Sequence, residues 1–243
     1  MIFIKIIRNI LNLLDDINQR KIIDLLSLKL KEKAVIFDVG AHHGETIKKF
    51  NKKLSIKKIY SFEASPVNFR ILLKNINKIN SSKFEIYNFA LGEKLSNSFI
   101  NQTIESSSST INKLNKKSRY YFRKLKVLKI KDKDQYYKRI PIEIITLDKF
   151  IEEKKISSID LLKVDTEGYE FKVIKGLNQN HNIIRYIYFE HHYDDMIIKD
   201  YKFNDINQLL KLYGFKMILK SKMIFRKSFE YVYENTKYNQ KEY

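Results

Sequence analysis

Short apolar runs alternate with amphipathic segments through the first part of the chain. Residues 34–40 (AVIFDVG), 57–64 (KKIYSFEA) and 84–91 (FEIYNFAL) have the length and composition of buried strands. Between them, residues 43–54 and 66–79 space their apolar positions as one face of a helix does. This β-α-β-α-β order predicts parallel strands that are joined by right-handed crossovers.

The alternation stops after residue 91 and resumes near residue 140. Residues 92–140 are predicted to form a polar loop and a basic, aromatic stretch. Strands are then expected at 140–146, 159–165, 185–192, 214–220 and 223–234, with helices at 147–155, 169–177 and 204–213. The whole pattern predicts a Rossmann-like α/β fold: a central, mostly parallel seven-stranded sheet with an antiparallel closing strand and helices on both faces.

Both ends of the chain differ from this central pattern. Residues 1–32 repeat apolar positions at helical spacing and form a predicted N-terminal amphipathic helical segment, which could contact a membrane surface peripherally. Lys5 and Arg8 interrupt its apolar start, which is too short for a membrane span and has no cleavage site of a signal peptide. We expect the main domain at 33–235 and a flexible tail at 236–243.

Composition limits the classes of chemistry. The 243 residues suffice for one α/β domain, and the absence of cysteine excludes disulfides and thiolate chemistry and suits the cytoplasm. Twelve lysines and arginines but only two aspartates lie in residues 112–140, a net charge of +10, so the rest of the chain carries +9 of the total +19. This basic insert either attracts an acidic or phosphorylated acceptor or is a solvated surface.

Only six glycines are present, and their spacing is informative. No pair fits the G-x-G-x-x-G dinucleotide motif or the phosphate-binding P-loop. Gly40 and Gly44 instead lie between the first strand and the first helix, where Gly40 permits a sharp turn and Gly44 leaves room for a ligand. Glu63 ends the second strand, where a carboxylate can accept hydrogen bonds from ribose hydroxyls.

At this point the chain resembles a known family. The segments DVGAHHGETI, SFEASPVNFRIL, NFALGE, SSSST, ITLDKFI, IDLLKVDTEGYEFKVIKGL and YIYFEHH are similar, in this order, to the FkbM methyltransferases, which have the class I fold. The resemblance implies S-adenosylmethionine as cofactor and O-methylation of a sugar or polyketide hydroxyl. It implies a cofactor site at Asp38, Gly40, Ala41, Gly44, Thr46, Glu63, Ala64, Asn88, Ala90, Leu91 and Asp165. His42-His43-Gly44 stands where the family often has Asn-x-Gly.

The candidate catalytic residues follow two later strands. Asp165 and Glu167 form a D-x-E-G sequence that resembles the family, and Asp165 shares a strand face with Lys163. Glu190 and His192 end the next strand and point the same way. A carboxylate or neutral imidazole here could remove the proton of an acceptor hydroxyl. Alternatively, Asp165 caps the following helix and His192 is structural.

Three further questions remain open at this stage. Asp165, Glu167, Glu190 and His192 could hold a divalent ion, but no compact ligand spacing requires one, and we predict no metal. The serine run 106–109 is a linker by composition, or it folds over the cofactor as the resemblance suggests. The aromatic side chains between Tyr120 and Tyr137 are interpreted as packing rather than base-stacking residues.

The sequence therefore predicts an S-adenosylmethionine-dependent methyltransferase. We expect it to act on a hydroxyl of a sugar, glycan or glycolipid precursor, with an acidic or phosphorylated acceptor as one form of this substrate. An RNA methyltransferase is the alternative enzyme, although the chain has no recognisable reader module for nucleic acid, and DNA is not expected as a partner. A non-catalytic basic scaffold with this fold is the third hypothesis.

Overall fold

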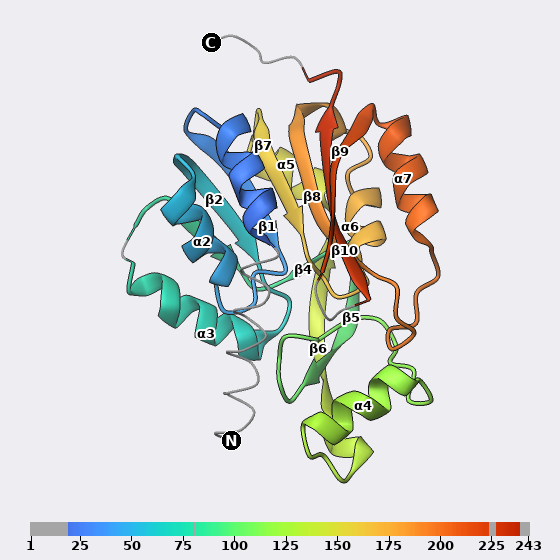
Figure 1. Cartoon of the computed structure of the whole chain (residues 1–243). Helices are drawn as coiled ribbons and strands as arrows, with labels where there is room; N and C mark the ends of the chain where they lie inside the picture. The colour runs from blue at the N-terminus through green and yellow to red at the C-terminus, as the bar shows by residue number, and fades with distance from the viewer. Residues whose placement is uncertain (1–18, 80, 224–226, 239–243) are drawn as a thin grey trace.

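A central sheet of seven strands dominates the computed structural model, which describes residues 19–79, 81–223 and 227–238 (Figure 1). The strands lie in the order β3-β2-β1-β7-β8-β10-β9, and neighbours are parallel except where β10 is involved. Their bounds are β1 Ala34–Val39, β2 Ile56–Phe62, β3 Phe84–Tyr87, β7 Ile159–Val164, β8 Ile184–His192, β9 Phe215–Lys222 and β10 Ser228–Asn235. The order reverses between β1 and β7, where open α/β sheets bind ligands at the carboxyl ends of the strands. The predicted fold is confirmed.

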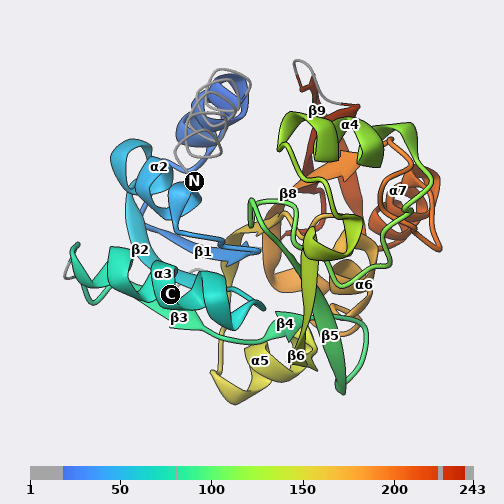
Figure 2. The same cartoon turned by 90° about the horizontal axis from the view of Figure 1, so that it is seen from below.

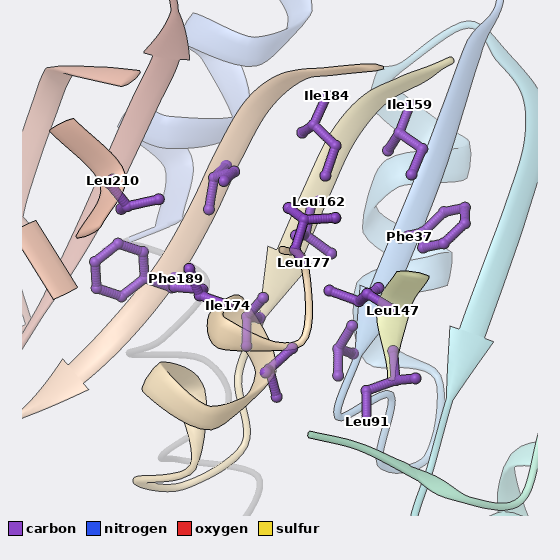
Figure 3. Close-up of a cluster of buried hydrophobic side chains, with 14 of the residues drawn as sticks. Phe37, Leu91, Leu147, Ile159, Leu162, Ile174, Leu177, Ile184, Phe189 and Leu210 are labelled. Carbon is purple, nitrogen blue, oxygen red and sulfur yellow. The ribbon is translucent and has the colours of Figure 1, made fainter. Parts of the chain in front are cut away.

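Helices cover both faces of this sheet (Figures 1 and 2). On one face lie the helix at residues 19–29, α2 (Glu45–Lys53) and α3 (Pro66–Asn77); on the other lie α5 (Leu147–Glu153), α6 (Glu170–Lys175) and α7 (Phe203–Leu212). Successive strand residues alternate between the two apolar layers, because their side chains point to opposite faces. Ile36 of β1 packs with α2 and α3, whereas Phe37 packs with α5 and α6 (Figure 3).

A second sheet departs from the sequence prediction. Its order is β4-β6-β5, with bounds β4 Ala90–Leu91, β5 Ser96–Thr103 and β6 Tyr137–Ile145. The prediction of one continuous strand at 84–91 is wrong, because the chain leaves the central sheet after Tyr87. The Asn88 side-chain amide donates to the carbonyl oxygen of Glu63 at 2.8 Å, and Ala90 then pairs with Ile144 of β6. The strand expected at 140–146 lies in β6 and therefore outside the central sheet.

The basic stretch 112–140 folds into an arm between β5 and β6. It contains α4 (Arg119–Val127) and the short 3₁₀ helix Lys133–Gln135, and its last residues already belong to β6. Tyr121 and Tyr136 are fully buried and meet edge to face, with ring centroids 5.3 Å apart. These two aromatic residues therefore have the packing role that the sequence suggested, whereas Phe122 is 44% exposed.

The N-terminal segment is described only from Gln19 onwards. Ile22 and Leu26 of its helix are buried against the α2 and α3 side of the sheet. The predicted membrane-contacting residues before position 19 lie outside the described part of the chain, as do residues 239–243 of the predicted tail. Among the described residues, no helix combines the length and the apolar character that crossing a membrane requires.

Candidate active site

A cavity of about 650 Å³ opens at the carboxyl ends of β1, β2, β7 and β8. This volume lies within the range of small-molecule and cofactor sites, roughly 300–1,000 Å³. Its walls come from the residues that follow each of these strands, and its cover from the serine run and α4. The predicted site residues among its lining are Gly40, Ala41, Thr46, Glu63, Ala64, Ala90, Leu91, Asp165, Glu167, Glu190 and His192.

The two glycines after β1 serve different purposes. Gly40 has a φ of 83°, and a Cβ atom there would lie 1.9 Å from the carbonyl oxygen of Asp165. The loops after β1 and β7 can therefore approach each other only with glycine at this position. Gly44, with a φ of 89°, would direct a Cβ atom at Leu72 and Ile76 of α3. A side chain at position 44 would therefore meet α3, and Gly44 is not among the residues that line the cavity, so its contact with a ligand stays a prediction.

Glu63 joins the end of β2 to the loop after β1. Its carboxylate accepts the backbone N–H groups of His42 at 2.7 Å and Ser65 at 2.9 Å, and only 5% of the residue is exposed. Burial raises its pKa to about 6, although both N–H groups oppose this shift. Asn68 Nδ2 also donates to this carboxylate, at 3.5 Å. A carboxylate offers about four acceptor positions, so these three bonds leave capacity for at least one hydroxyl of a ribose. The residue therefore fits a nucleoside cofactor and also holds the loop.

The segment after β3 contributes two of its predicted cofactor residues to the cavity wall. Ala90 and Leu91 line the cavity, together with Phe89. Asn88 is not among the lining residues, because its amide is turned to the carbonyl oxygens of Glu63 and Ala64. Asn88 therefore links the ends of β2 and β3 by hydrogen bonds.

A buried lysine links the ends of β1 and β7. Lys163 Nζ lies 3.2 Å from Asp38 Oδ1 and 3.4 Å from Asp165 Oδ2. Burial disfavours its charged form, but the two aspartates more than offset this and raise its pKa above the ordinary value. Asp38 is fully buried and is not among the cavity-lining residues, whereas the side chain of Asp165 is 29% exposed at the cavity wall. Asp38 therefore acts on the cavity through Lys163.

An imidazole between two carboxylates forms the most polar part of the cavity. His192 Nε2 lies 3.4 Å from Glu167 Oε2 and 3.6 Å from Glu190 Oε1. Burial disfavours the imidazolium, yet the two glutamates outweigh it and raise the pKa of His192 to about 10. Burial also raises the pKa of Glu167, to about 7, against the opposing effect of His192. The two glutamates therefore favour the imidazolium form of His192, and its role as a base stays a prediction.

The loop after β7 holds Glu167 in a strained conformation. Its φ is 50°, a value that non-glycine residues seldom adopt and that often marks functional sites. Thr110 Oγ1 donates to the carbonyl oxygen of Glu167 at 2.7 Å, and Asn112 Nδ2 donates to that of Gly168 at 2.6 Å. Hydrogen bonds from the arm between β5 and β6 therefore fix the backbone that carries Glu167.

The alternative role of Asp165 as a helix cap is wrong. The helix begins at Glu170, and Tyr169 occupies the cap position. The Glu170 carboxylate accepts the N–H groups of Thr166 at 3.2 Å and Gly168 at 2.8 Å, so it holds the loop that precedes the helix. Asp165 is thereby left at the cavity wall beside Lys163.

The serine run 106–109 lines the cavity opposite the loop after β1. Ser106 Oγ lies 2.8 Å from His42 Nε2, and Ser108 is bonded to Lys124 of α4. Lys124 also pairs with buried Glu105 at 2.8 Å, which accepts a hydrogen bond from Tyr136 at the same distance. The run therefore adjoins the predicted cofactor loop, and its folding over the cofactor stays a prediction.

Comparison with known protein families identifies the family of this chain. Residues 38–217 match the methyltransferase FkbM domain, a span that includes the loop after β1, the D-x-E-G sequence and the end of β8. The chain belongs to the FkbM methyltransferase family. S-adenosylmethionine is its cofactor, and the chain is a methyltransferase by family and fold. No curated protein matches the sequence.

Solved structures share the fold of this FkbM methyltransferase at low sequence identity. Methyltransferase FkbM from Methylobacillus flagellatus is similar with a TM-score of 0.52 and 13% identity, over 83% of this chain and 44% of that one. The present chain thus spans less than half of that protein. A SAM-dependent methyltransferase from Aquifex aeolicus is similar with a TM-score of 0.50 and 12% identity, over 90% of both chains. At these identities the similarity establishes the fold alone.

Metal-ligand geometry in this FkbM methyltransferase occurs away from the residues first considered. Among the described residues, the ligand atoms of His42, His43 and Glu45 lie within 4.8 Å of one another, at the start of α2. The carboxylates at the ends of β7 and β8 do not form such a group. The His42 and His43 rings also stack, with centroids 3.7 Å apart, so the departure from the family's Asn-x-Gly motif creates a distinct polar surface beside the cofactor loop.

Sequence reasoning missed several polar residues of the site. Asp194 Oδ2 lies 3.7 Å from His192 Nδ1, and Glu105 anchors the cover of the cavity. Asp194 follows the strand end by two positions, a spacing that could have marked it. Glu105 and Thr110 lie in a polar loop without periodicity, so no local signal distinguished them. Lys48 and Lys52, on the exposed side of α2, were also not predicted to line the cavity.

Proposed function

We propose that this protein transfers a methyl group to a hydroxyl of a sugar, glycan or glycolipid precursor. When bound, S-adenosylmethionine supplies a sulfonium methyl group, and transfer to a hydroxyl oxygen leaves the neutral thioether and releases the hydroxyl proton. The chain must therefore orient the hydroxyl and accept its proton. The cluster of Glu167, His192 and Glu190 carries the proposal, because it places a carboxylate with a raised pKa, that of Glu167, at the wall of the cavity.

Glu167 is the proposed general base. Its pKa of about 7 is close to the pH at which a base works best, because the group is then both available and basic enough to accept the proton. The imidazolium of His192 stabilises the ionised carboxylate at 3.4 Å. Asp165, which shares the cavity wall, is proposed to orient the acceptor hydroxyl.

The other hypotheses receive different support. Burying two carboxylates and an imidazole in a cavity is costly, because burial opposes their charged forms. Such clusters are typical of functional sites, which argues against a non-catalytic scaffold. An RNA methyltransferase is favoured by the net charge of +10 in residues 112–140. It remains the second candidate, and its test is included with the anion experiment below. We also propose a cytoplasmic location, with peripheral membrane contact through residues 1–32.

Replacing Glu167 by glutamine tests the proposed base. We expect turnover with a hydroxyl acceptor to fall roughly 10²–10⁴-fold, the usual contribution of a general base. Wild-type kcat/KM should fall as pH drops through about 7, because Glu167 then becomes protonated. S-adenosylhomocysteine affinity, measured by calorimetry, should stay unchanged in Glu167→Gln, which separates lost chemistry from a lost cofactor site.

A second assay identifies the class of acceptor and separates it from the assignment of Glu167 as the base. Labelled methyl transfer would be measured on fractionated lipid, polysaccharide and RNA extracts. Wild-type turnover in Glu167→Gln would reject the base assignment. Label that enters only RNA would reject the sugar acceptor while leaving the methyltransferase assignment intact.

A further inference from the structure

Three exposed cations line the mouth of the cavity from two separate helices. Lys48 and Lys52 come from α2, and Arg123 comes from α4. None of the three has a carboxylate within 4.0 Å among the residues that the structure describes. Seen from the carboxyl ends of the strands, α2 and α4 lie on opposite sides of the molecule (Figure 2). Both helices therefore contribute positive charge to the lining of one cavity.

The neighbouring cations have different surroundings. Lys49 Nζ donates to Gln19 Oε1 at 2.7 Å, and Lys124 pairs with Glu105 at 2.8 Å. These side chains hold elements of the protein together. Within the described part of the chain, Lys48, Lys52 and Arg123 have no such ion pair, so these residues leave their charge available to a ligand.

The buried carboxylates and the exposed cations of the cavity differ in their access to solvent. Glu63 and Glu190 are 5% and 6% exposed, so these two carboxylates lie in the wall, whereas the three cations are exposed. Glu45 and Asp165 also line the cavity, and their side chains are 38% and 29% exposed. The buried carboxylates suit a cofactor with a positive sulfonium, but they would repel an anionic acceptor that entered fully. An anion held at the rim, with its uncharged hydroxyl directed inward, satisfies both regions.

We propose that Lys48, Lys52 and Arg123 bind a phosphoryl group of the acceptor and thereby select phosphorylated sugars or sugar-lipid precursors. This inference rests on the proposed function for the identity of the methylated group, but not for the anion site itself. Phosphate suits the site because it carries more than one negative charge and several acceptor oxygens, whereas a single carboxylate could engage fewer cations. The guanidinium of Arg123 can make paired hydrogen bonds to it, and the lysines act as point charges.

Binding of inorganic pyrophosphate, measured by calorimetry, tests the anion site without requiring turnover. The triple variant Lys48→Gln/Lys52→Gln/Arg123→Gln should bind pyrophosphate at least about tenfold more weakly than wild type, since each partly exposed pair contributes modestly. The matched control is Lys53→Gln/Lys126→Gln/Arg119→Gln, which removes three cations from the same two helices at positions that do not line the cavity. It should change affinity less than about twofold. S-adenosylhomocysteine affinity should be unchanged in both variants.

Three results would overturn the proposal. Equal weakening in both triple variants would mean that pyrophosphate responds to overall surface charge, and absence of pyrophosphate binding would mean that no such site exists. A single-stranded RNA that displaces pyrophosphate and is weakened equally by both variants would assign the cations to a nucleic-acid surface and also reject the proposal. Pyrophosphate binding lost only in the cavity variant would support it even if the hydroxyl methylation assay failed.

The source of the phosphoryl group can be distinguished in the same variants. Glucose 1-phosphate and glucose would be compared as competitors of pyrophosphate, and phosphatidylcholine vesicles with and without phosphatidylglycerol would be compared by sedimentation. Selective loss of glucose 1-phosphate competition in the cavity variant identifies a soluble sugar phosphate. Selective loss of binding to the anionic vesicles identifies a lipid-borne phosphate.

Discussion

At the scale of single residues, Glu63 has two tasks that a substitution can separate. Replacing it by glutamine keeps the shape but removes the negative charge that would accept a ribose diol. We expect S-adenosylhomocysteine to bind about 10–100-fold more weakly, because a hydrogen bond to a charged group contributes more than one to a neutral group. Calorimetry measures this change.

The structural task of Glu63 requires a parallel measurement. The carboxylate also accepts the N–H groups of His42 and Ser65, so Glu63→Gln can lose one of these bonds. Urea unfolding of the same variant shows how much stability is lost. An unchanged dissociation constant in the folded variant would reject the ribose assignment, whatever the change in stability.

At the scale of elements, Glu105 connects the loop after β5 to two parts of the arm, α4 and Tyr136. This carboxylate is 8% exposed and lies 2.8 Å from both Lys124 Nζ and the hydroxyl of buried Tyr136. Glu105→Ala leaves the buried Tyr136 hydroxyl without this acceptor and leaves Lys124 with Ser108 alone, so we expect the free energy of unfolding to fall by about 2 kcal/mol. Asp134→Ala removes the exposed partner of Lys116 in the same arm and should have no measurable effect. Equal midpoints of urea unfolding in both variants would contradict this role.

At the scale of the whole molecule, several buried groups bind protons more tightly in the folded chain. Burial raises the pKa of Glu63, Glu167 and Glu230 from 4.5 to about 6, 7 and 8. In the unfolded chain these carboxyls release their protons near pH 4.5, so the folded chain holds more protons between pH 4.5 and 8. The free energy of unfolding should therefore be highest at the acidic end of this window and fall as pH rises through it.

The contribution of Glu230 to this pH dependence can be isolated. The residue is fully buried, directly opposite Glu190 in the β8–β10 pair, and Tyr188 donates a hydrogen bond to it. Glu230→Gln cannot ionise, so its unfolding free energy should fall less steeply between pH 5 and 8, by at most about 1.4 kcal/mol per pH unit. Thermal and urea unfolding across this range provide the measurement. Parallel pH profiles for wild type and variant would show that Glu230 does not contribute to the slope.

The order of motifs along the chain determined the fold and much of the cavity wall. Alternating strands and helices predict a parallel sheet from local periodicity, and parallel strands bring their carboxyl ends to one edge. Gly40, Glu63, Asp165 and His192 could therefore be assigned to one region, because each follows or ends such a strand. The family resemblance added the cofactor, which spacing alone did not identify.

Tertiary structure decided what depends on residues far apart in sequence. The break in the strand at Asn88 follows from the bond of its side chain to the carbonyl oxygen of Glu63. A side chain at position 44 would meet Leu72 and Ile76 of α3, a contact that only the tertiary structure shows. The imidazolium form of His192 is favoured by two glutamates brought within 3.6 Å, which outweigh the effect of burial, and a local pattern records none of these contacts. The presence of Lys48, Lys52 and Arg123 in the lining of one cavity likewise depends on how the arm folds, because periodicity reports which side of a helix is polar but not what faces it.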